Sequence, residues 1–187
     1  MKAIAIVGSP RKKGNTEILT RHTLRAIGEE GLDTELISLA GLDIKPCTAC
    51  MVCKKEESCP IEDDLWPIYT KMKEADAIIL ATPVYVGSAT AQIKALMDRT
   101  AYIAYSGRKF EGKVGGPLAV GERAGQNFTV AQLSYWFYIM GCLMPGSTHW
   151  NVAFGLDKGE VEKDEEGLET ARVFGKNIAL LVKKLKS

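Results

Sequence analysis

Short apolar runs alternate along this chain with longer segments in which apolar residues recur at helical spacing. The short runs end at glycine, proline or polar residues and predict buried strands at residues 2–7, 34–39, 76–81, 114–120 and 142–148. The amphipathic segments predict helices at about residues 15–30, 65–75, 89–99, 126–141 and 167–185. Residues 155–166 are polar and charged, which is typical of a solvated loop.

The regular alternation of strand and helix predicts the fold class. It is typical of an α/β protein with a doubly wound, five-stranded parallel sheet and helices on both faces. The 187 residues fit one domain, 1–187, because no linker or internal repeat divides them. An irregular, cysteine-rich insertion at 41–64 follows the second predicted strand. Because such sheets bind ligands at the carboxyl ends of their strands, we expect the site in the loops there.

Composition and charge narrow the class of partner. Hydrophobic residues make up 46% of the chain and charged residues 25%, which is typical of a globular protein. A formal net charge of +1 gives no electrostatic reason to expect nucleic acid or a membrane as a partner. The N-terminal apolar run is too short for a signal peptide, and no stretch is long enough to span a bilayer. We therefore expect a cytoplasmic protein, in which the five cysteines are reduced, metal-bound or catalytic.

The loop after the first predicted strand has the chemistry of a phosphate site. It opens a helix, whose first N–H groups and partial positive charge favour an anion. Ser9, Asn15 and Thr16 add side-chain donors, Arg11 adds positive charge, and Gly14 permits a tight turn. The loop matches neither G-x-G-x-x-G nor the P-loop pattern, which argues against those two nucleotide sites. The alternative interpretation is an ordinary capped helix beside a basic surface loop.

Four of the five cysteines lie within thirteen residues, and this is the most informative pattern in the chain. Cys47, Cys50, Cys53 and Cys59 stand at spacings that allow all four thiolates to reach one 4Fe–4S cluster. A zinc site is an alternative, although structural zinc sites usually separate two cysteine pairs by a dozen or more residues. A segment that binds no metal and a dithiol redox site also remain open. Cys142 lies in an apolar stretch and is predicted to be a buried core thiol.

Several motifs together resemble one known family. The sequence G-S-P-R-x-x-G-N-T at 8–16 resembles the FMN-phosphate loop of the NADPH-dependent FMN reductase family, whose fold is flavodoxin-like. The segments 82–88 and 121–126 resemble the second and third flavin loops of that family, and 93–99 resembles the helix after the second loop. The cysteine run resembles that of the iron–sulfur flavoproteins of anaerobic archaea and bacteria, a branch of the family.

The resemblance implies FMN and a 4Fe–4S cluster as cofactors, and it implies their binding residues. The implied phosphate-binding residues are Ser9, Arg11, Gly14, Asn15 and Thr16. The residues implied to lie along the flavin ring and ribityl chain are Pro83, Val84, Tyr85, Gly87 and Ser88. Those implied to border the ring are Gly121, Glu122, Arg123 and Gly125. The implied cluster ligands are Cys47, Cys50, Cys53 and Cys59.

Three functions follow as hypotheses. The first, which the resemblance favours, is an iron–sulfur flavoprotein that takes electrons from a ferredoxin-like donor and assembles as a homodimer or homotetramer. The second is a cluster-free reductase that passes hydride from NAD(P)H through FMN to a flavin or quinone acceptor. The third is a non-catalytic binding module with structural zinc. No single catalytic residue is predicted, because the cofactors carry the chemistry in the first two cases.

Overall fold

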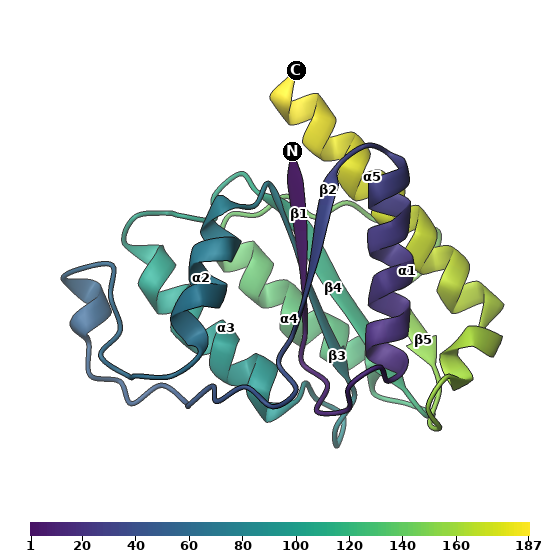
Figure 1. Ribbon diagram of the computed structural model, residues 1–187, viewed down its shortest axis with the longest axis horizontal. Coiled ribbons are helices and arrows are strands. Elements are labelled where there is room, and N and C mark those ends of the chain that lie inside the picture. The colour runs from purple at the N-terminus through teal and green to yellow at the C-terminus, as the bar shows by residue number, and fades with distance from the viewer.

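The computed structural model describes residues 1–187, and its centre is a sheet of five parallel strands (Figure 1). The strands stand in the order β2-β1-β3-β4-β5, which is the flavodoxin-like order. Their carboxyl ends all lie along one edge, at the bottom of Figure 1. The strands are β1 Lys2–Val7, β2 Asp33–Ser38, β3 Ala77–Pro83, β4 Val114–Gly121 and β5 Val152–Phe154.

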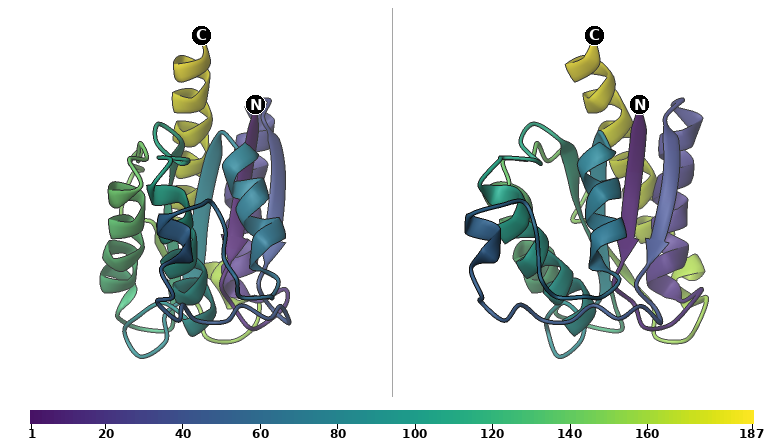
Figure 2. Two further views of the ribbon diagram at one scale, coloured as in Figure 1. Left: turned by 90° about the vertical axis from the view of Figure 1, so that its left-hand side faces the viewer. Right: turned by 60° about the vertical axis from the view of Figure 1, so that its left-hand side comes forward.

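Helices cover both faces of the sheet, as the alternating pattern predicts. α1 and α5 pack together on one face, and α2, α3 and α4 cover the other (Figures 1 and 2). The cysteine-rich segment projects beyond α2 and α3 and carries a short 3₁₀ helix, η1 Val52–Lys54; a second, η2 Glu160–Lys163, precedes α5. The helices are α1 Asn15–Glu29, α2 Leu65–Glu74, α3 Ala91–Tyr105, α4 Gln126–Ile139 and α5 Glu165–Lys186.

Burial on both faces explains why the central strands are continuous apolar runs. Every residue of β4 is buried, as are all residues of β3 except Pro83 and all of β1 except Lys2. Glycine has a low strand propensity, but the sheet requires Gly115 at its position in β4. A Cβ atom there would stand 1.9 Å from the carbonyl oxygen of Ile78 on β3, closer than any real contact. The glycine therefore permits the close approach of two central strands.

The fifth strand was predicted at 142–148, and this prediction is wrong. Only one isolated bridge, between Leu143 and Val114, forms there, and the strand lies at Val152–Phe154. Gly115 and Ala119 donate their N–H groups to Leu143 and Asn151 respectively. Pro117 stands between them on β4 and has no N–H to continue the ladder. The intervening chain therefore leaves the sheet and returns only beside Ala119–Gly121.

Helix boundaries differ most at α3, which runs to Tyr105 and not to Arg99. Its N-cap is Thr90, whose hydroxyl accepts the N–H of Ile93 at 3.5 Å. Its last turns continue because Ile103 and Ala104 are buried against the core. None of the helices has both the length and the apolar character that a bilayer crossing requires.

Candidate functional site

The loops after four strands meet at the carboxyl edge of the sheet and enclose a cavity of about 150 Å³. It lies where the strand order reverses between β1 and β3, the place where doubly wound sheets bind ligands. Ten of the fourteen residues expected to bind FMN line it. They are Ser9, Arg11, Gly14, Asn15, Thr16, Pro83, Val84, Tyr85, Gly121 and Glu122. The structure thus brings together segments that are more than one hundred residues apart in the sequence.

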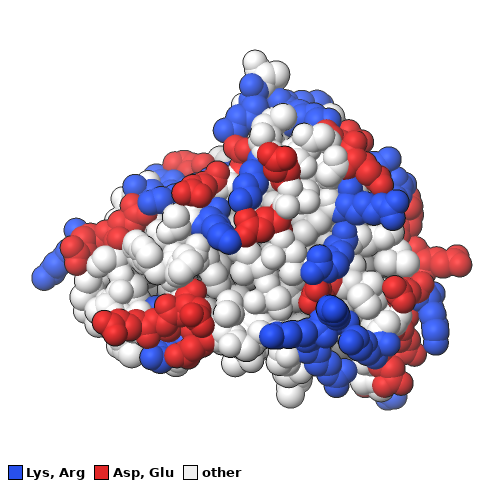
Figure 3. Space-filling model, viewed as in Figure 1, with Lys and Arg blue, Asp and Glu red and all other residues white.

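The N-terminus of α1 supplies the donors of this cavity. Gly14 is the N-cap and offers no side chain, so the first N–H groups of the helix have no capping partner. The N–H groups of Asn15 and Thr16 donate to no group of the chain, and the Thr16 hydroxyl makes no hydrogen bond either. Basic side chains gather over this end of α1 (lower right in Figure 3). These free donors and the positive field suit a phosphate group.

The tight turn before α1 falls at Lys13 and not at Gly14. Lys13 has a positive φ of 54°, whereas Gly14 is extended with φ −86° and ψ −179°. Glu17 stabilises this turn, because its carboxylate accepts the Lys13 N–H at 2.8 Å and two N–H groups of Arg21. At Gly14, a Cβ atom would stand 3.2 Å from the Cβ of Arg11, so the glycine provides space within the loop.

Glu17 gives this loop a dependence on pH. Burial alone would raise the pKa of Glu17, but the Lys13 N–H and the Arg21 guanidinium together lower it below its ordinary value of 4.5. The carboxylate therefore stabilises the folded state fully above pH 4.5, and this contribution is lost as pH falls through the lower folded pKa. Glu17→Gln is expected to lower the free energy of unfolding at pH 7 by about 1–2 kcal/mol and to flatten its decline in acid.

The matched control for this variant is Glu29→Gln in the same helix. Glu29 pairs with Arg25 at the same i,i+4 spacing, but its side chain is 54% exposed, against 6% for Glu17. Its loss is expected to cost less than about 0.5 kcal/mol. Chemical denaturation of the FMN-free protein between pH 3 and 7 measures both. Equal effects of the two substitutions would contradict the role given to Glu17.

The Asn15 side chain holds a fourth loop against the phosphate loop. Its amide donates to the carbonyl of Asp157 at 2.8 Å and accepts the N–H of Gly159 at 2.8 Å. Arg11 donates to the carbonyl of Leu156 at 3.2 Å. Residues 155–166 were predicted to be only a solvated loop, but Gly155 and Leu156 form a wall of the cavity. Because the fifth strand was predicted at 142–148, residues 155–156 were not expected at the carboxyl edge of the sheet. They lie there because they directly follow β5 at Val152–Phe154.

The second of the loops expected to bind flavin, 82–88, is a tight turn with a strained residue at its tip. Tyr85 and Ser88 exchange two backbone hydrogen bonds, of 2.8 and 3.1 Å, and both central residues have positive φ. Gly87 adopts φ 73° freely, but Val86 adopts φ 52°, which is unfavourable for a β-branched residue. Val86 is fully exposed, so no packing compensates for the strain. Ser88 lies outside the cavity and donates to Gln132 of α4 at 2.9 Å.

Relieving the strain at Val86 is expected to stabilise the protein. Val86→Asn creates Asn-Gly, the pair preferred in turns with two positive φ values, and should raise the free energy of unfolding by about 1 kcal/mol. The melting temperature should rise by about 2–4 °C. Val86→Ala removes the β-branch but keeps the unfavourable φ, so it should recover only part of the gain. A melting temperature of the asparagine variant at or below that of the wild type would refute this assignment.

The third loop expected to bind flavin, 121–126, packs against the second, 82–88. Gly125 is the N-cap of α4 with φ 92°, and a Cβ atom there would stand 2.9 Å from Val84 and 3.0 Å from Gly87. Gly87 and Gly125 therefore fit the two loops together and do not line the cavity. The Arg123 side chain also lies outside it and is 88% exposed, with Glu122 at 4.0 Å as its only ionic contact.

The cysteine segment forms a second candidate site beside α3. Cys47, Cys50, Cys53 and Cys59 all line one mostly apolar cavity of about 60 Å³, together with Arg99, Tyr102 and Ile103 of α3. Burial, the largest cause, raises the pKa of the Cys53 thiol, and the three other cysteines add to this shift. No three of these side chains surround a single metal-ion position. The structure therefore assembles a shared thiol pocket from one short segment.

The outer end of this segment is held by Glu57. Its carboxylate contacts the ammonium groups of Lys73 at 2.7 Å and Lys109 at 3.0 Å and accepts the Tyr69 hydroxyl at 3.0 Å. The Lys73 hydrogen bond is the largest cause that lowers the pKa of Glu57, to about 2. Nothing in the sequence pattern indicated this residue, because its partners lie on α2 and after α3. Glu57 keeps the segment against the body of the protein.

Cys142 takes no part in the thiol pocket. Burial raises the pKa of its thiol to about 12, and its Sγ donates to the carbonyl of Phe110 at 3.4 Å. It packs against the hydrophobic core on the α2–α4 face, although it is not fully buried. These contacts describe an unreactive thiol.

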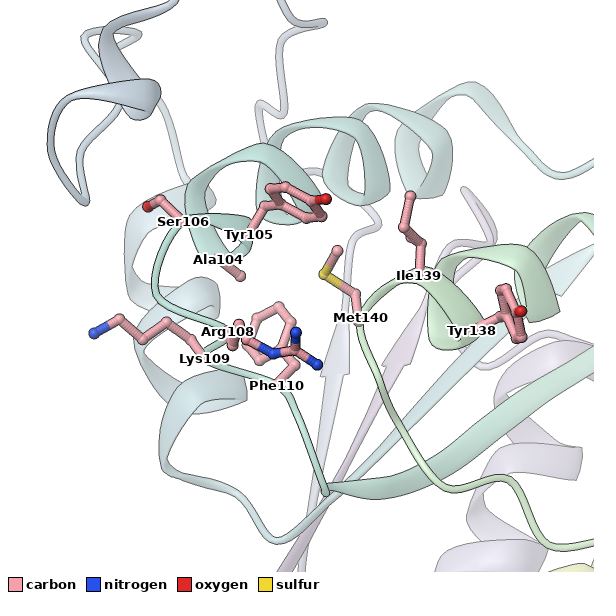
Figure 4. A pocket seen from close by; sticks show the side chains of 9 residues that line it. All are labelled: Ala104, Tyr105, Ser106, Arg108, Lys109, Phe110, Tyr138, Ile139 and Met140. Carbon is pink, nitrogen blue, oxygen red and sulfur yellow. The ribbon is translucent and has the colours of Figure 1, made fainter.

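The largest of the cavities described here, about 580 Å³, lies at the opposite edge of the sheet, between the C-terminal ends of α3 and α4 (Figure 4). Tyr105 of α3, Ile139 of α4 and Met140 directly after α4 line it, with Arg108 and Lys109 between the helices. Arg108 pairs with Glu111, and Lys109 pairs with Glu57. The cavity therefore presents no unpaired cation, and it shares no residue with either site above.

The fold and the first cavity define a flavodoxin-like protein whose sheet-edge cavity has free backbone donors suited to an anion. Known proteins agree. Residues 1–157 match the family model of the NADPH-dependent FMN reductases. An iron–sulfur flavoprotein of Methanocaldococcus jannaschii is 46% identical over 193 residues, with full coverage of both chains. An iron–sulfur flavoprotein of Methanosarcina thermophila is 35% identical over 181 residues, covering 95% of this chain and 93% of that one.

Solved structures with lower identity support the fold alone. The crystal structure of RosB with a bound flavin-derived intermediate matches with a TM-score of 0.80 at 17% identity, covering all of this chain and 80% of that one. An archaeal flavodoxin matches with a TM-score of 0.65 at 18% identity, covering 98% and 99% of the two chains. The chain belongs to the NADPH-dependent FMN reductase family, in its iron–sulfur flavoprotein branch. It is an FMN-dependent oxidoreductase.

Proposed function

We propose that this protein is an iron–sulfur flavoprotein that moves electrons between a ferredoxin-like donor, a 4Fe–4S cluster, FMN and an acceptor. The observation that carries the proposal is the convergence of Cys47, Cys50, Cys53 and Cys59 on one cavity. Relatives that are 46% and 35% identical bear the name iron–sulfur flavoprotein, and their similarity extends over nearly the whole chain.

The donor set of the cysteine cavity fits a cluster. A 4Fe–4S cluster takes one thiolate at each of four iron atoms. Four thiols line this one cavity, which is the number that a cluster requires. The apolar walls from Ile61, Tyr102 and Ile103 would limit the access of water to a cluster.

The residues of the sheet-edge cavity fit FMN. The free N–H groups of Asn15 and Thr16 and the Thr16 hydroxyl would hold the phosphate, while Arg11 supplies positive charge. Pro83, Val84 and Tyr85 would lie along the ring system. When bound, FMN accepts one or two electrons and the cluster passes one at a time. The protein's part is to position both groups and to exclude water from them.

The partners belong to the same proposal. A ferredoxin-like protein would donate electrons at the cysteine segment, whose outer surface includes exposed Cys47 and Cys50. Five free cysteines with no disulfide suit the reducing cytoplasm. The side chains of Tyr135, Tyr138 and Ile139 on α4 are 60–79% exposed. Such an aromatic surface favours assembly into a homodimer or homotetramer.

The test is an absorption spectrum of anaerobically purified protein, with iron, sulfide and FMN measured on the same sample. About four iron and four sulfide per FMN would support the proposal. A flavin spectrum without iron, after attempted reconstitution with iron and sulfide, would contradict it. The same sample mixed rapidly with NADPH or with reduced ferredoxin identifies the donor.

The family description supports a second candidate, an NAD(P)H-dependent FMN or quinone reductase without a cluster. Tyr85, at the mouth of the sheet-edge cavity, is 47% exposed, which leaves room for a nicotinamide to approach the ring. Fast bleaching of the flavin by NADPH in an iron-free sample would favour this reductase.

A further inference from the structure

Arg99 is the buried charge that the proposed electron-transfer function does not yet use. It lies on α3 and is 2% exposed, and it lines the thiol cavity together with the four cysteines. Burial of a guanidinium is costly unless it is paired, so its partners reveal what holds it there. They all belong to the cysteine segment or its flanks.

Arg99 joins the two ends of the cysteine segment. Its Nη1 donates to the carbonyl of Lys45 at 3.0 Å, two residues before Cys47. Its Nη2 donates to the carbonyl of Ile61 at 3.4 Å, two residues after Cys59. The same guanidinium therefore contacts the backbone just before the first cysteine and just after the last of the four.

Asp63 completes this connection. Its carboxylate pairs with Arg99, and its side chain is 1% exposed. The same carboxylate accepts the N–H of Lys45 at 2.9 Å and that of Leu65 at 3.1 Å. Arg99 and Asp63 are each other's counter-charge, and four of their additional bonds hold backbone groups at the two ends of the cysteine segment.

Arg99 also contacts a cysteine directly. Its Nη2 lies 3.4 Å from the Cys59 Sγ and donates to it, and its Nε is buried without any partner. Lys45, Lys54 and Lys55, the lysines next to the cysteines in the sequence, are exposed, and solvent screens their charge. The guanidinium is therefore the least screened cation at this site, and the Asp63 carboxylate offsets its charge.

We propose that Arg99 is a positioning residue for the cluster. It holds together Lys45 and Ile61, the two ends that form the neck of the cysteine segment, and its N–H bond to Cys59 raises the reduction potential of the cluster. Because Asp63 offsets the charge of Arg99, the hydrogen bond to the ligand sulfur carries the effect, and such bonds favour the more negative, reduced state. This inference rests on the proposed function for its second part. Its first part, closure of the neck, holds for the protein without iron as well.

The experiment compares Arg99→Gln and Arg99→Lys with the exposed control Lys54→Gln. The midpoint potential of the cluster is measured by reductive titration followed by electron paramagnetic resonance. Hydrogen exchange of residues 45–61 is measured on iron-free protein. Arg99→Gln should shift the potential to a more negative value and increase exchange in 45–61 at least tenfold. Lys54→Gln makes the same change in charge and should move neither.

Arg99→Lys separates the two parts, because lysine keeps the charge but lacks the planar fork that reaches two carbonyls. The cluster potential of Arg99→Lys should lie between those of the wild type and Arg99→Gln, while hydrogen exchange in 45–61 stays fast. If Arg99→Gln retains no iron, the potential is measured on Arg99→Lys alone. Wild-type potential together with wild-type exchange in Arg99→Gln would overturn the inference. If the wild-type protein binds no iron, the proposed function is wrong. The hydrogen-exchange comparison on iron-free protein still tests whether Arg99 holds the neck of the cysteine segment together.

Discussion

Replacing Cys50 with serine is expected to reduce the iron content from about four per chain to less than one while FMN stays bound. Cys50 is exposed at the outer side of the thiol cavity, and serine is a poor ligand for iron at neutral pH. The flavin cavity lies at the carboxyl edge of the sheet and shares no residue with the thiol cavity, so FMN should be unaffected. Iron, sulfide and flavin analysis of the anaerobically purified variant measures the effect.

The control is Cys142→Ser, which removes the one cysteine outside the segment. Cys142 contacts the carbonyl of Phe110, and a serine hydroxyl can make the same bond. Its iron and flavin contents should match those of the wild type. Full iron in Cys50→Ser, or equal loss in the two variants, would show that the thiol cavity is not the cluster site.

The second large effect is expected from Thr16→Asp, which places a carboxylate among the free donors of α1. A like charge close to the phosphate costs on the order of 4 kcal/mol before screening, so FMN affinity should fall by about 100-fold or more. Thr16 is buried, so a carboxylate there should also lower the stability of the flavin-free protein, although the helix N-terminus offsets part of this cost. Fluorescence titration of flavin-free protein with FMN measures the affinity.

His22→Asp is the matched control for the added charge. It lies in the same helix about 9 Å further along the axis and changes the charge equally. FMN affinity should fall less than about threefold, because salt screens a charge at that distance. Thr16→Asp with wild-type FMN affinity would place the phosphate elsewhere. Binding of riboflavin, which lacks the phosphate, should respond little to either substitution.

The strands that are buried on both faces could be predicted well from the sequence. β1, β3 and β4 are apolar throughout, because helices cover both of their faces and no polar position is tolerated. β5 could not be predicted. It has only three residues, and its position depends on where Pro117 interrupts the ladder of the neighbouring strand. That information belongs to the pairing of two segments and not to either one.

The candidate sites also contain features that could be predicted from the sequence and features that could not. The loops at 9–16 and 83–85 and the cysteine spacing were visible because each is a continuous motif. The roles of individual residues within them were not. Asn15 uses its side chain to hold the loop after β5, and Ser88 holds α4, because their partners come from distant parts of the chain. Glu57 carried no motif, and Arg99 ended the 93–99 segment that resembles a family helix, but no local pattern indicated its contacts with the cysteine segment.

The layered α/β fold, the donor-rich loop at the start of α1 and the grouping of four thiols can be inferred from the sequence alone. Each depends on local periodicity, local turn chemistry or close spacing along the chain. Two features required the folded chain: residues 155–156 form a wall of the sheet-edge cavity, and a buried Arg99–Asp63 pair contacts both ends of the cysteine segment. Burial and pairing of polar groups depend on which distant segments meet, and packing of the whole chain sets those meetings.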